Sequence, residues 1–309
     1  MFYNDEITYQ EFEIGDETGI LTLFQTVFLE SMKKIWNYYY EGSFISPINH
    51  NHHVITTAKD AGKIVGTACI VASTINYYGT LIKGGIVKDV MVHPDYQRRG
   101  IFTRVSKKNI EIARSYGYEF LFSLPNKNSY PAFNKYLNWQ TVTPVNIFEY
   151  QLNKAPYEKV SYNVFQATEN YDLPDLSMAI SNIQTLRDKN YFKRRYSEHW
   201  NRDKYFFLIN NNGLIVLKKY TVDIAHIMDI IPIKGIQELL NSAIHFLSIK
   251  GCSLLNTFSP FFENDLLDFG FREKKGSTYF IVKSLTDRPI EQYKNIKSYY
   301  VSLGDSDVY

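Results

Sequence analysis

Residues 86–102 read IVKDVMVHPDYQRRGIF, and this stretch decides the fold of the chain. Residues 86–92 are apolar and rich in β-branched side chains, which predicts a strand. The strand ends before Pro94, because proline has no N–H group for further pairing. From Ile101 to Tyr116 apolar side chains recur at helical spacing. The sequence therefore predicts a strand, a short basic turn with one glycine, and an amphipathic helix in direct succession.

The turn between this strand and this helix has the chemistry of a phosphate site. The first backbone N–H groups of a helix lack intrahelical partners and lie at the positive end of the helix dipole, so they bind phosphate. Gly100 would let the backbone approach a pyrophosphate closely, and Arg98 and Arg99 add positive charge at short range. The alternative is an ordinary strand-to-helix turn with solvated arginines, and the turn alone does not separate the two.

The elements predicted after this helix continue an α/β order. Gly117 stands where a helix stop is expected, and residues 118–124 read as a buried strand that ends at Pro125. Residues 126–139 then predict an asparagine-rich turn and a short helix that stops at Trp139. This order favours the phosphate-binding interpretation of the turn.

Together these elements resemble the acetyl-CoA-binding core of the GNAT superfamily of N-acetyltransferases. The signature of that family is Gln/Arg-x-x-Gly-x-Gly/Ala, and Gln97 and Gly100 match it. Phe102 departs from the last small position, so its side chain must point away from the ligand. The resemblance implies an α/β fold (α+β, with a mixed central sheet flanked by helices). It also implies transfer of an acetyl group from acetyl-CoA to a primary amine of a small molecule, an amino sugar or another amine.

The resemblance further implies where acetyl-CoA would bind. Backbone N–H groups near Met91 and Val92 would hold the pantetheine arm or polarise the thioester carbonyl. The pyrophosphate would lie on the amides of residues 98–102. The expected coenzyme-binding residues are Met91, Val92, Gln97, Arg98, Arg99, Gly100, Ile101, Phe102, Asn126 and Ser129.

Asp89 and Tyr136 are candidates for catalysis. Asp89, on the same strand, would accept the amine proton directly or through water. The alternative is a strand-end carboxylate paired with Lys88 or an arginine. The family commonly places a proton-donating tyrosine in the last helix, at the position where this chain has Asn134. Tyr136 or Tyr130 would then substitute, although a tyrosine at helical spacing is also typical of a core.

Residues 299–309 are apolar and then acidic, which indicates a docked C-terminal segment. Tandem GNAT aminoglycoside acetyltransferases use their C-terminal carboxylate in catalysis. By that resemblance the terminal carboxylate of Tyr309, or the side chain of Asp305 or Asp307, would lie near the amine. The alternative is an anchoring strand with acidic solvent contacts.

The length of 309 residues predicts two cores of about 150 residues each. Residues 206–271 predict a hairpin, a strand, a helix and a further strand. Gly251 and Phe271 stand at nearly the same offset from Gly117 and Trp139, respectively, which indicates a duplicated domain.

We therefore expect tandem GNAT-like domains. Residues 1–152 would be the acetyl-CoA-binding catalytic domain, and residues 153–309 a degenerate copy whose C-terminal segment packs back toward the interface. Residues 229–236 lack the signature, so the second half is not expected to hold a second coenzyme. The basic run at residues 193–195 is interpreted as the solvated face of a helix.

Composition excludes several classes of partner. The net charge of +2 gives no single-sign field of the kind that nucleic-acid binders show. Cys69 and Cys252 fall one in each half, which favours a reducing cytoplasm without disulfides. Residues 1–6 are acidic where a signal peptide would be basic, and no apolar run reaches membrane-spanning length. We expect a soluble cytoplasmic protein whose partner is a small-molecule amine, with no nucleic acid and no membrane.

Two local clusters have alternative interpretations. His50, His52 and His53 lie close together, but no Cys or carboxylate stands at a matching ligand interval, so we expect no metal. The aromatic residues within 36–40 would flank the acceptor site in a GNAT fold, or pack in the core.

Two other classes of function remain open beside the N-acetyltransferase. Fem-type aminoacyltransferases also carry two GNAT-like halves, but they usually have a long helical-hairpin arm, and no extended heptad run occurs here. A catalytically inactive binding module would be expected to lose its phosphate turn, which residues 97–102 keep. The sequence favours the acetyltransferase, and fold analogy cannot choose its acceptor.

Overall fold

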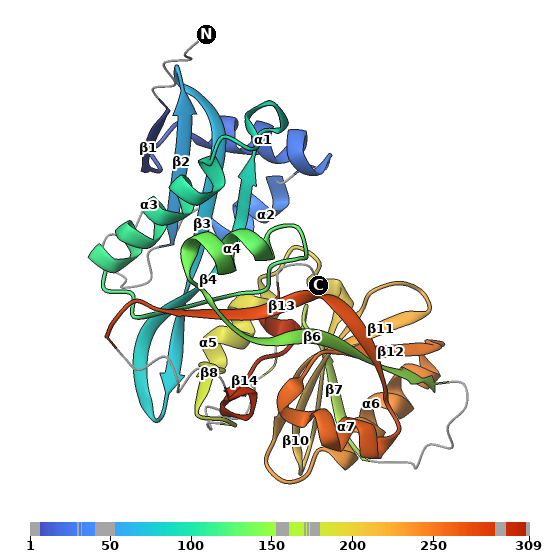
Figure 1. The fold of residues 1–309 in the computed structure, drawn as a ribbon. Helices are drawn as coiled ribbons and strands as arrows, with labels where there is room; N and C mark the ends of the chain where they lie inside the picture. Colours follow the sequence, from blue (N-terminus) through green and yellow to red (C-terminus); the bar gives the residue numbers. More distant parts are fainter. Residues whose placement is uncertain are drawn as a thin grey trace. The chain divides into compact units, whose positions relative to one another are not determined.

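The structure, a computed structural model, shows the predicted α/β class, with mixed sheets flanked by helices (Figure 1). It describes residues 7–29, 31, 33–40, 53–152, 161–169, 171, 173, 180–287 and 295–306. The chain divides into two compact units. Unit 1 consists of residues 1–75, 81–143 and 279–294, and unit 2 of residues 76–80, 144–278 and 295–309.

This division differs from the expected domains 1–152 and 153–309. The chain leaves unit 1 after residue 143 and returns to it at residue 279. The return occurs because one long strand, β13 (Arg272–Ser284), completes the sheet of unit 1 with its last residues.

The sheet of unit 1 follows the order β1-β2-β3-β4-β5-β13. The bounds of the first five strands are Thr8–Glu11, Val54–Asp60, Lys63–Tyr77, Thr80–Val92 and Phe120–Ser123. β1, β2 and β3 pair antiparallel, β4 pairs parallel with β5, and β5 pairs antiparallel with residues 281–284 of β13. The parallel β4–β5 pair, joined by a helix, is the predicted strand–turn–helix–strand order.

Helices cover both faces of this sheet. Among the described residues of unit 1, the helices are α1 (Glu17–Phe28), α2 (Lys33–Tyr39), α3 (Ile101–Ser115) and α4 (Tyr130–Leu137). Successive strand side chains point to opposite faces. Ile55 accordingly packs with the residues of α1, whereas the adjacent Val54 packs with those of α3 and α4. Asn109 of α3 is polar and yet buried, and its amide is satisfied because it donates to the backbone oxygens of Val54 and Ala68.

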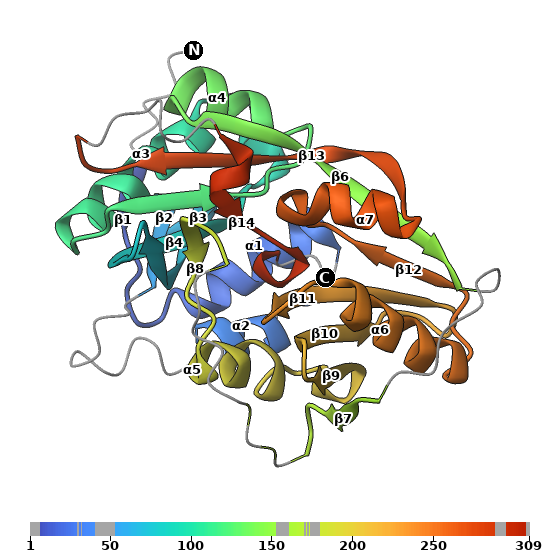
Figure 2. The ribbon, with the colours of Figure 1, turned by 90° about the horizontal axis from the view of Figure 1, so that it is seen from below.

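Unit 2 contains the elements predicted for residues 206–271. Its strands follow the order β7-β9-β10-β11-β12-β6. Their bounds are Asn163–Gln166, Tyr205–Asn210, Gly213–Lys219, Ile224–Pro232, Leu254–Thr257 and Gln140–Gln151. Helix α6 (Gln237–Ile249) packs on β9, β10 and β11, and α7 (Glu263–Phe269) follows β12 (Figure 2). Both units therefore contain a hairpin, a strand, a helix and a parallel strand in the same order, and the proposed duplication rests on this observation.

The C-terminal segment is docked within unit 2. Strand β14 (Tyr299–Tyr300) pairs with β8 (Ile183–Thr185), and residues 299–306 are buried. Asp307 and Tyr309 lie outside the described residues, as do His50 and His52.

The sequence predicts that the basic run at residues 193–195 is the solvated face of a helix, and this prediction is wrong for Arg195. It lies in a π-helical turn, Lys193–Ser197, which follows α5 (Lys189–Phe192). Arg195 is buried because its guanidinium donates to the backbone oxygens of Gly304 and Ser306, at 2.7 Å each. No described helix combines the length and the apolar character that crossing a membrane requires.

Candidate active site

The predicted phosphate turn lies between the end of β4 and the start of α3. A 3₁₀ turn, Pro94–Tyr96, follows the strand, and Gly100 is the N-cap residue of α3 with φ 76°. Glycine adopts this left-handed conformation without steric cost. A Cβ atom built on Gly100 would meet nothing closer than the Arg104 guanidinium at 4.0 Å, and no side chain caps the helix. The backbone N–H groups of the first turn of α3 are therefore accessible to a ligand.

Arginines surround this turn. Arg98 and Arg99 are exposed, and the guanidinium of Arg99 lies 4.8 Å from the centre of the Tyr96 ring. Arg104 donates from Nη2 to the backbone oxygen of Arg99 at 2.6 Å. Arg104 was not among the predicted residues, although it stands one helical turn after Gly100 and hence on the same face of α3.

The strands β4 and β5 separate next to this turn. Their registered pairs run only from Gly84 to Ile86, and the hydroxyl of Ser123, the last residue of β5, donates to the Val87 oxygen at 2.8 Å. β4 continues to Val92 beyond that point. An edge of the β4 backbone is therefore left without its β5 partner.

The backbone of Val92, rather than that of Met91, faces this open edge. His93 donates its N–H to the Val65 oxygen of β3 at 2.9 Å. Because alternate residues of a strand direct their N–H groups to opposite edges, the Val92 N–H is directed away from β3. The side chain of Met91 is buried in the core beneath α1. Of the two expected backbone contacts, the geometry thus fits Val92.

Asp89 interrupts the regular conformation of β4. Its φ of 49° is in the left-handed region, which costs a non-glycine residue about 1–3 kcal/mol and is often retained at functional sites. Its side chain is 10% exposed. The carboxylate accepts a hydrogen bond from the Tyr40 hydroxyl at 2.6 Å and lies 3.8 Å from the Lys88 ammonium. The Lys88 pairing considered from the sequence is therefore present, and Tyr40 is an additional partner.

Two of the groups near Asp89, Tyr40 and Cys69, are held in their neutral forms. Burial, and then the charge of Asp89, raise the pKa of Tyr40 well above its usual value, so its hydroxyl stays protonated and donates. Burial, with the Asp89 charge, also raises the pKa of the Cys69 thiol to about 12. Tyr40 belongs to the aromatic run whose two interpretations were core packing and a site. Tyr40 fits both interpretations, because its ring packs in the core beside Trp36 and its hydroxyl contacts Asp89.

The start of α4 is fixed by residues expected to contact coenzyme. The side-chain oxygen of Asn126 accepts the backbone N–H groups of Asn128 and Ser129, at 2.9 and 3.2 Å. These bonds form the turn that begins the helix. Phe102 packs its ring against Phe133 at 5.4 Å, so this side chain occupies the contact between α3 and α4.

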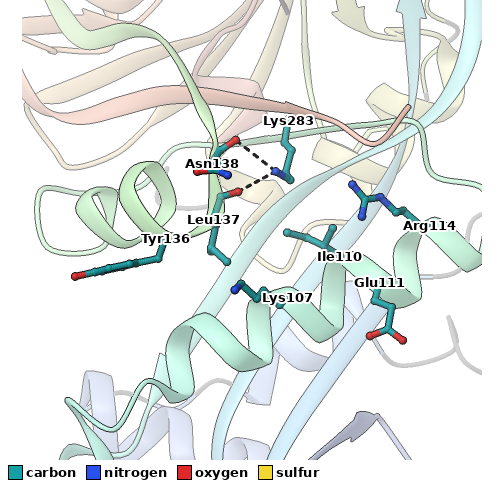
Figure 3. Close-up of a pocket in the computed structure, with 8 residues that line it drawn as sticks. All are labelled: Lys107, Ile110, Glu111, Arg114, Tyr136, Leu137, Asn138 and Lys283. Carbon is teal, nitrogen blue, oxygen red and sulfur yellow. Dashed lines mark hydrogen bonds between the residues drawn. The ribbon is translucent and has the colours of Figure 1, made fainter. Parts of the chain in front are cut away.

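The two predicted proton donors, Tyr130 and Tyr136, have different surroundings, and Asn134 stands at the position where the family commonly has a tyrosine. Asn134 donates its amide to the oxygens of Trp139 and Thr141, and the Tyr130 hydroxyl lies 2.8 Å from Thr141 Oγ1. Tyr136 is 55% exposed and lines a separate pocket, from which its ring points away (Figure 3). The structure thus brings Asp89 of β4 together with Tyr40, which directly follows α2, but leaves Tyr136 on an outer face of α4. Tyr309, the third catalytic candidate, lies outside the described residues.

One family model matches the part of the chain that contains this site. Residues 8–142 match the sequence model of a family described as an acetyltransferase (GNAT) domain. A comparison with curated protein sequences gives no match. The match to the family model identifies residues 8–142 as an acyltransferase domain of the GNAT superfamily.

Solved structures of similar fold cover nearly the whole chain. A GCN5-related N-acetyltransferase from Kribbella flavida is 12% identical, with a TM-score of 0.66 over 91% of this chain and 72% of its own. A probable N-acyltransferase from Enterococcus faecalis V583 is 10% identical, with a TM-score of 0.66 over 90% and 72%. A putative acetyltransferase from Pyrococcus horikoshii is 14% identical, with a TM-score of 0.54 over 97% and 94%. At these identities the likeness concerns the fold.

Proposed function

We propose that this protein transfers an acetyl group from acetyl-CoA to a primary amine of a small molecule, such as an amino sugar. The observation that carries the proposal is the open N-terminus of α3 at Gly100, next to the part of β4 that extends beyond its pairing with β5. A pyrophosphate would bind the amides of that helix turn, with Arg98, Arg99 and Arg104 around it. The pantetheine arm would then follow the edge of β4.

The thioester carbonyl would receive its hydrogen bond from the Val92 N–H. Such a donor stabilises the negative charge that develops on the oxygen when the amine attacks. The attack forms the C–N bond and breaks the C–S bond, so the amine loses a proton and the departing thiolate gains one. Asp89 is the proposed acceptor of the amine proton, and the Tyr40 hydroxyl holds its carboxylate in place.

The proton for the thiolate has a less direct source. Asn134 stands where the family commonly has a tyrosine, and an amide can donate a hydrogen bond but no proton. Tyr130 and Tyr136 therefore remain the proposed donors, and the carboxylate of Tyr309 remains an alternative base. Two buried cysteines without a disulfide are consistent with the proposed cytoplasmic location.

A thermal-shift titration with acetyl-CoA tests the coenzyme site. At a hundredfold excess over Kd the ligand should stabilise the native protein by about 2.7 kcal/mol. Gly100→Glu should abolish this stabilisation, because it places a carboxylate against the pyrophosphate. Gly117→Glu is the matched control, since Gly117 has the same φ of 76° and a Cβ atom built on it would meet nothing within 4 Å.

The control separates backbone strain from ligand contact. Both substitutions place a residue with a side chain where the backbone is left-handed, which costs about 1–2 kcal/mol. Only Gly100→Glu should lose the response to acetyl-CoA. Equal loss of the response in both variants, or no response of the native protein, would remove the assignment.

A further inference from the structure

A pocket of about 290 Å³ lies in unit 1 at the opposite end of α3 from the phosphate turn. It is lined by Lys107, Ile110, Glu111, Arg114, Tyr136, Leu137, Asn138 and Lys283 (Figure 3). At a rise of about 1.5 Å per residue, Arg114 lies roughly 20 Å along the helix axis from Gly100. The pocket is therefore distinct from the proposed coenzyme site.

Three cations line this pocket. Figure 3 shows the side chains of Arg114 and Lys283 directed toward each other, whereas the ammonium of Lys107 lies on the side of Leu137. Glu111 is the acidic residue of the lining, but its carboxylate points away from these three groups and pairs with Lys108 at 3.0 Å. The pocket thus carries an excess of positive charge that its own lining does not neutralise.

Lys283 is held in position for a ligand. Its ammonium donates to the backbone oxygens of Leu137 and Asn138, at 2.8 and 3.4 Å, where α4 ends. An ammonium has three donors, so one remains after these two bonds. Burial, and then the charge of Arg114, lower the pKa of Lys283, which is the direction expected where cations meet without an anion.

We propose that this pocket binds the phosphate group of a small organic phosphate. Arg114 offers a planar pair of N–H donors that matches phosphate oxygens, and the two lysines supply further charge-assisted hydrogen bonds. The side chains of Ile110 and Leu137 form an apolar wall beside the cations. The volume exceeds that of a phosphate ion alone, so the organic part of the ligand lies against this wall.

Calorimetric titration of the native protein with inorganic phosphate, ribose 5-phosphate and unphosphorylated ribose tests the proposal. Ribose 5-phosphate should bind, ribose should not, and inorganic phosphate should bind more weakly than the ester. Equal affinity for inorganic phosphate and the ester would overturn the inference that the pocket binds the organic part of the ligand. Absence of binding by both phosphates at millimolar concentration would overturn the site.

Variants assign the binding to the pocket. Arg114→Gln should weaken ribose 5-phosphate binding by about tenfold or more, because it removes a charge-assisted donor. Lys135→Gln is the control, because it removes one positive charge on α4 outside the pocket. A loss of affinity equal in both variants would mean that only the general charge of the surface matters, and would overturn the proposal.

A last measurement separates the pocket from the coenzyme. Arg114→Gln should leave the thermal shift with acetyl-CoA unchanged, since its side chain is far from Gly100. If the substitution weakens the binding of acetyl-CoA instead, the pocket is part of the coenzyme site, and this result would exclude a separate ligand in the pocket. Loss of the phosphate response with an intact acetyl-CoA response supports both assignments independently.

Discussion

Arg187 and Asp229 form a fully buried ion pair in unit 2, in which Nε donates to Oδ1 at 2.9 Å and the side chains are 1% and 0% exposed. The same guanidinium donates from Nη2 to Asp305 Oδ2 at 2.6 Å. Ser302 donates its hydroxyl to Asp229 Oδ1 at 2.6 Å. These bonds fasten the C-terminal segment to β11. The sequence places Asp305 among the carboxylates that could lie near the amine. In the structure this carboxylate instead forms an ion pair with Arg187.

Arg187→Met should destabilise the protein by about 3–5 kcal/mol, because it leaves two buried carboxylates without their counter-charge. Urea unfolding monitored by circular dichroism measures the loss. Lys193→Met is the control, since Lys193 is 70% exposed in its ion pair with Glu198 and should change stability by less than about 0.5 kcal/mol. Similar stability of the two variants would show that the buried pair contributes no more than a surface pair.

His226 of β11 should make stability depend on pH. Burial, and then the charge of Lys218, lower the pKa of His226 to about 4 from its ordinary value of 6.5. Between those two pH values the unfolded chain binds a proton that the folded chain does not, so stability falls as the pH is lowered through this range. His226→Gln should therefore flatten the difference in unfolding free energy between pH 7 and pH 5. A native protein that loses no more stability than the variant over this range would contradict the prediction.

Asp89→Asn should lower kcat by about 10² to 10⁴-fold while the acetyl-CoA thermal shift persists, because only the proposed proton acceptor is lost. Tyr40→Phe should have a smaller effect and should move the acid limb of the kcat/KM profile to higher pH. The reason is that the carboxylate loses a hydrogen bond that favours its charged form. Coenzyme-dependent thiol release across amino sugars and polyamines measures both. Unchanged turnover of a well-folded Asp89→Asn protein would shift the role of base to another group, such as the Tyr309 carboxylate.

The local elements of unit 1 could be predicted because their signals are local. The strand, the glycine turn and the helix of residues 86–116 follow from side-chain periodicity and from Gly100, and each is present. Arg104 was within reach of the same reasoning, since it lies one helical turn from Gly100. The sequence also indicates that the side chain of Phe102 points away from a ligand, and its ring packs against Phe133, a contact that the sequence does not predict.

The buried polar groups could not be predicted because their partners are distant in sequence. Tyr40 and Asp89 are joined only after α2 packs beneath β4, and neither position has a local signal for the other. Arg195 looked like a solvated residue because its acceptors are carbonyl oxygens near the end of the chain. The sequence shows Asp229 only as part of a segment that lacks the coenzyme-binding signature. Its role in the structure is the ion pair with Arg187, which is distant in sequence.

The long strand β13 has a consequence for the order in which the protein can fold during synthesis. β5 lies between β4 and β13, and its second neighbour is supplied by residues 281–284. Until the ribosome has added those residues, one edge of β5 stays open, and open strand edges are sites of aberrant pairing. N-terminal domains usually fold first on the ribosome, but this contact joins residues 120–123 to residues 281–284, about half the chain apart, and such contacts are intrinsically slow to form. Unit 1 therefore completes its sheet only after most of unit 2 has been made.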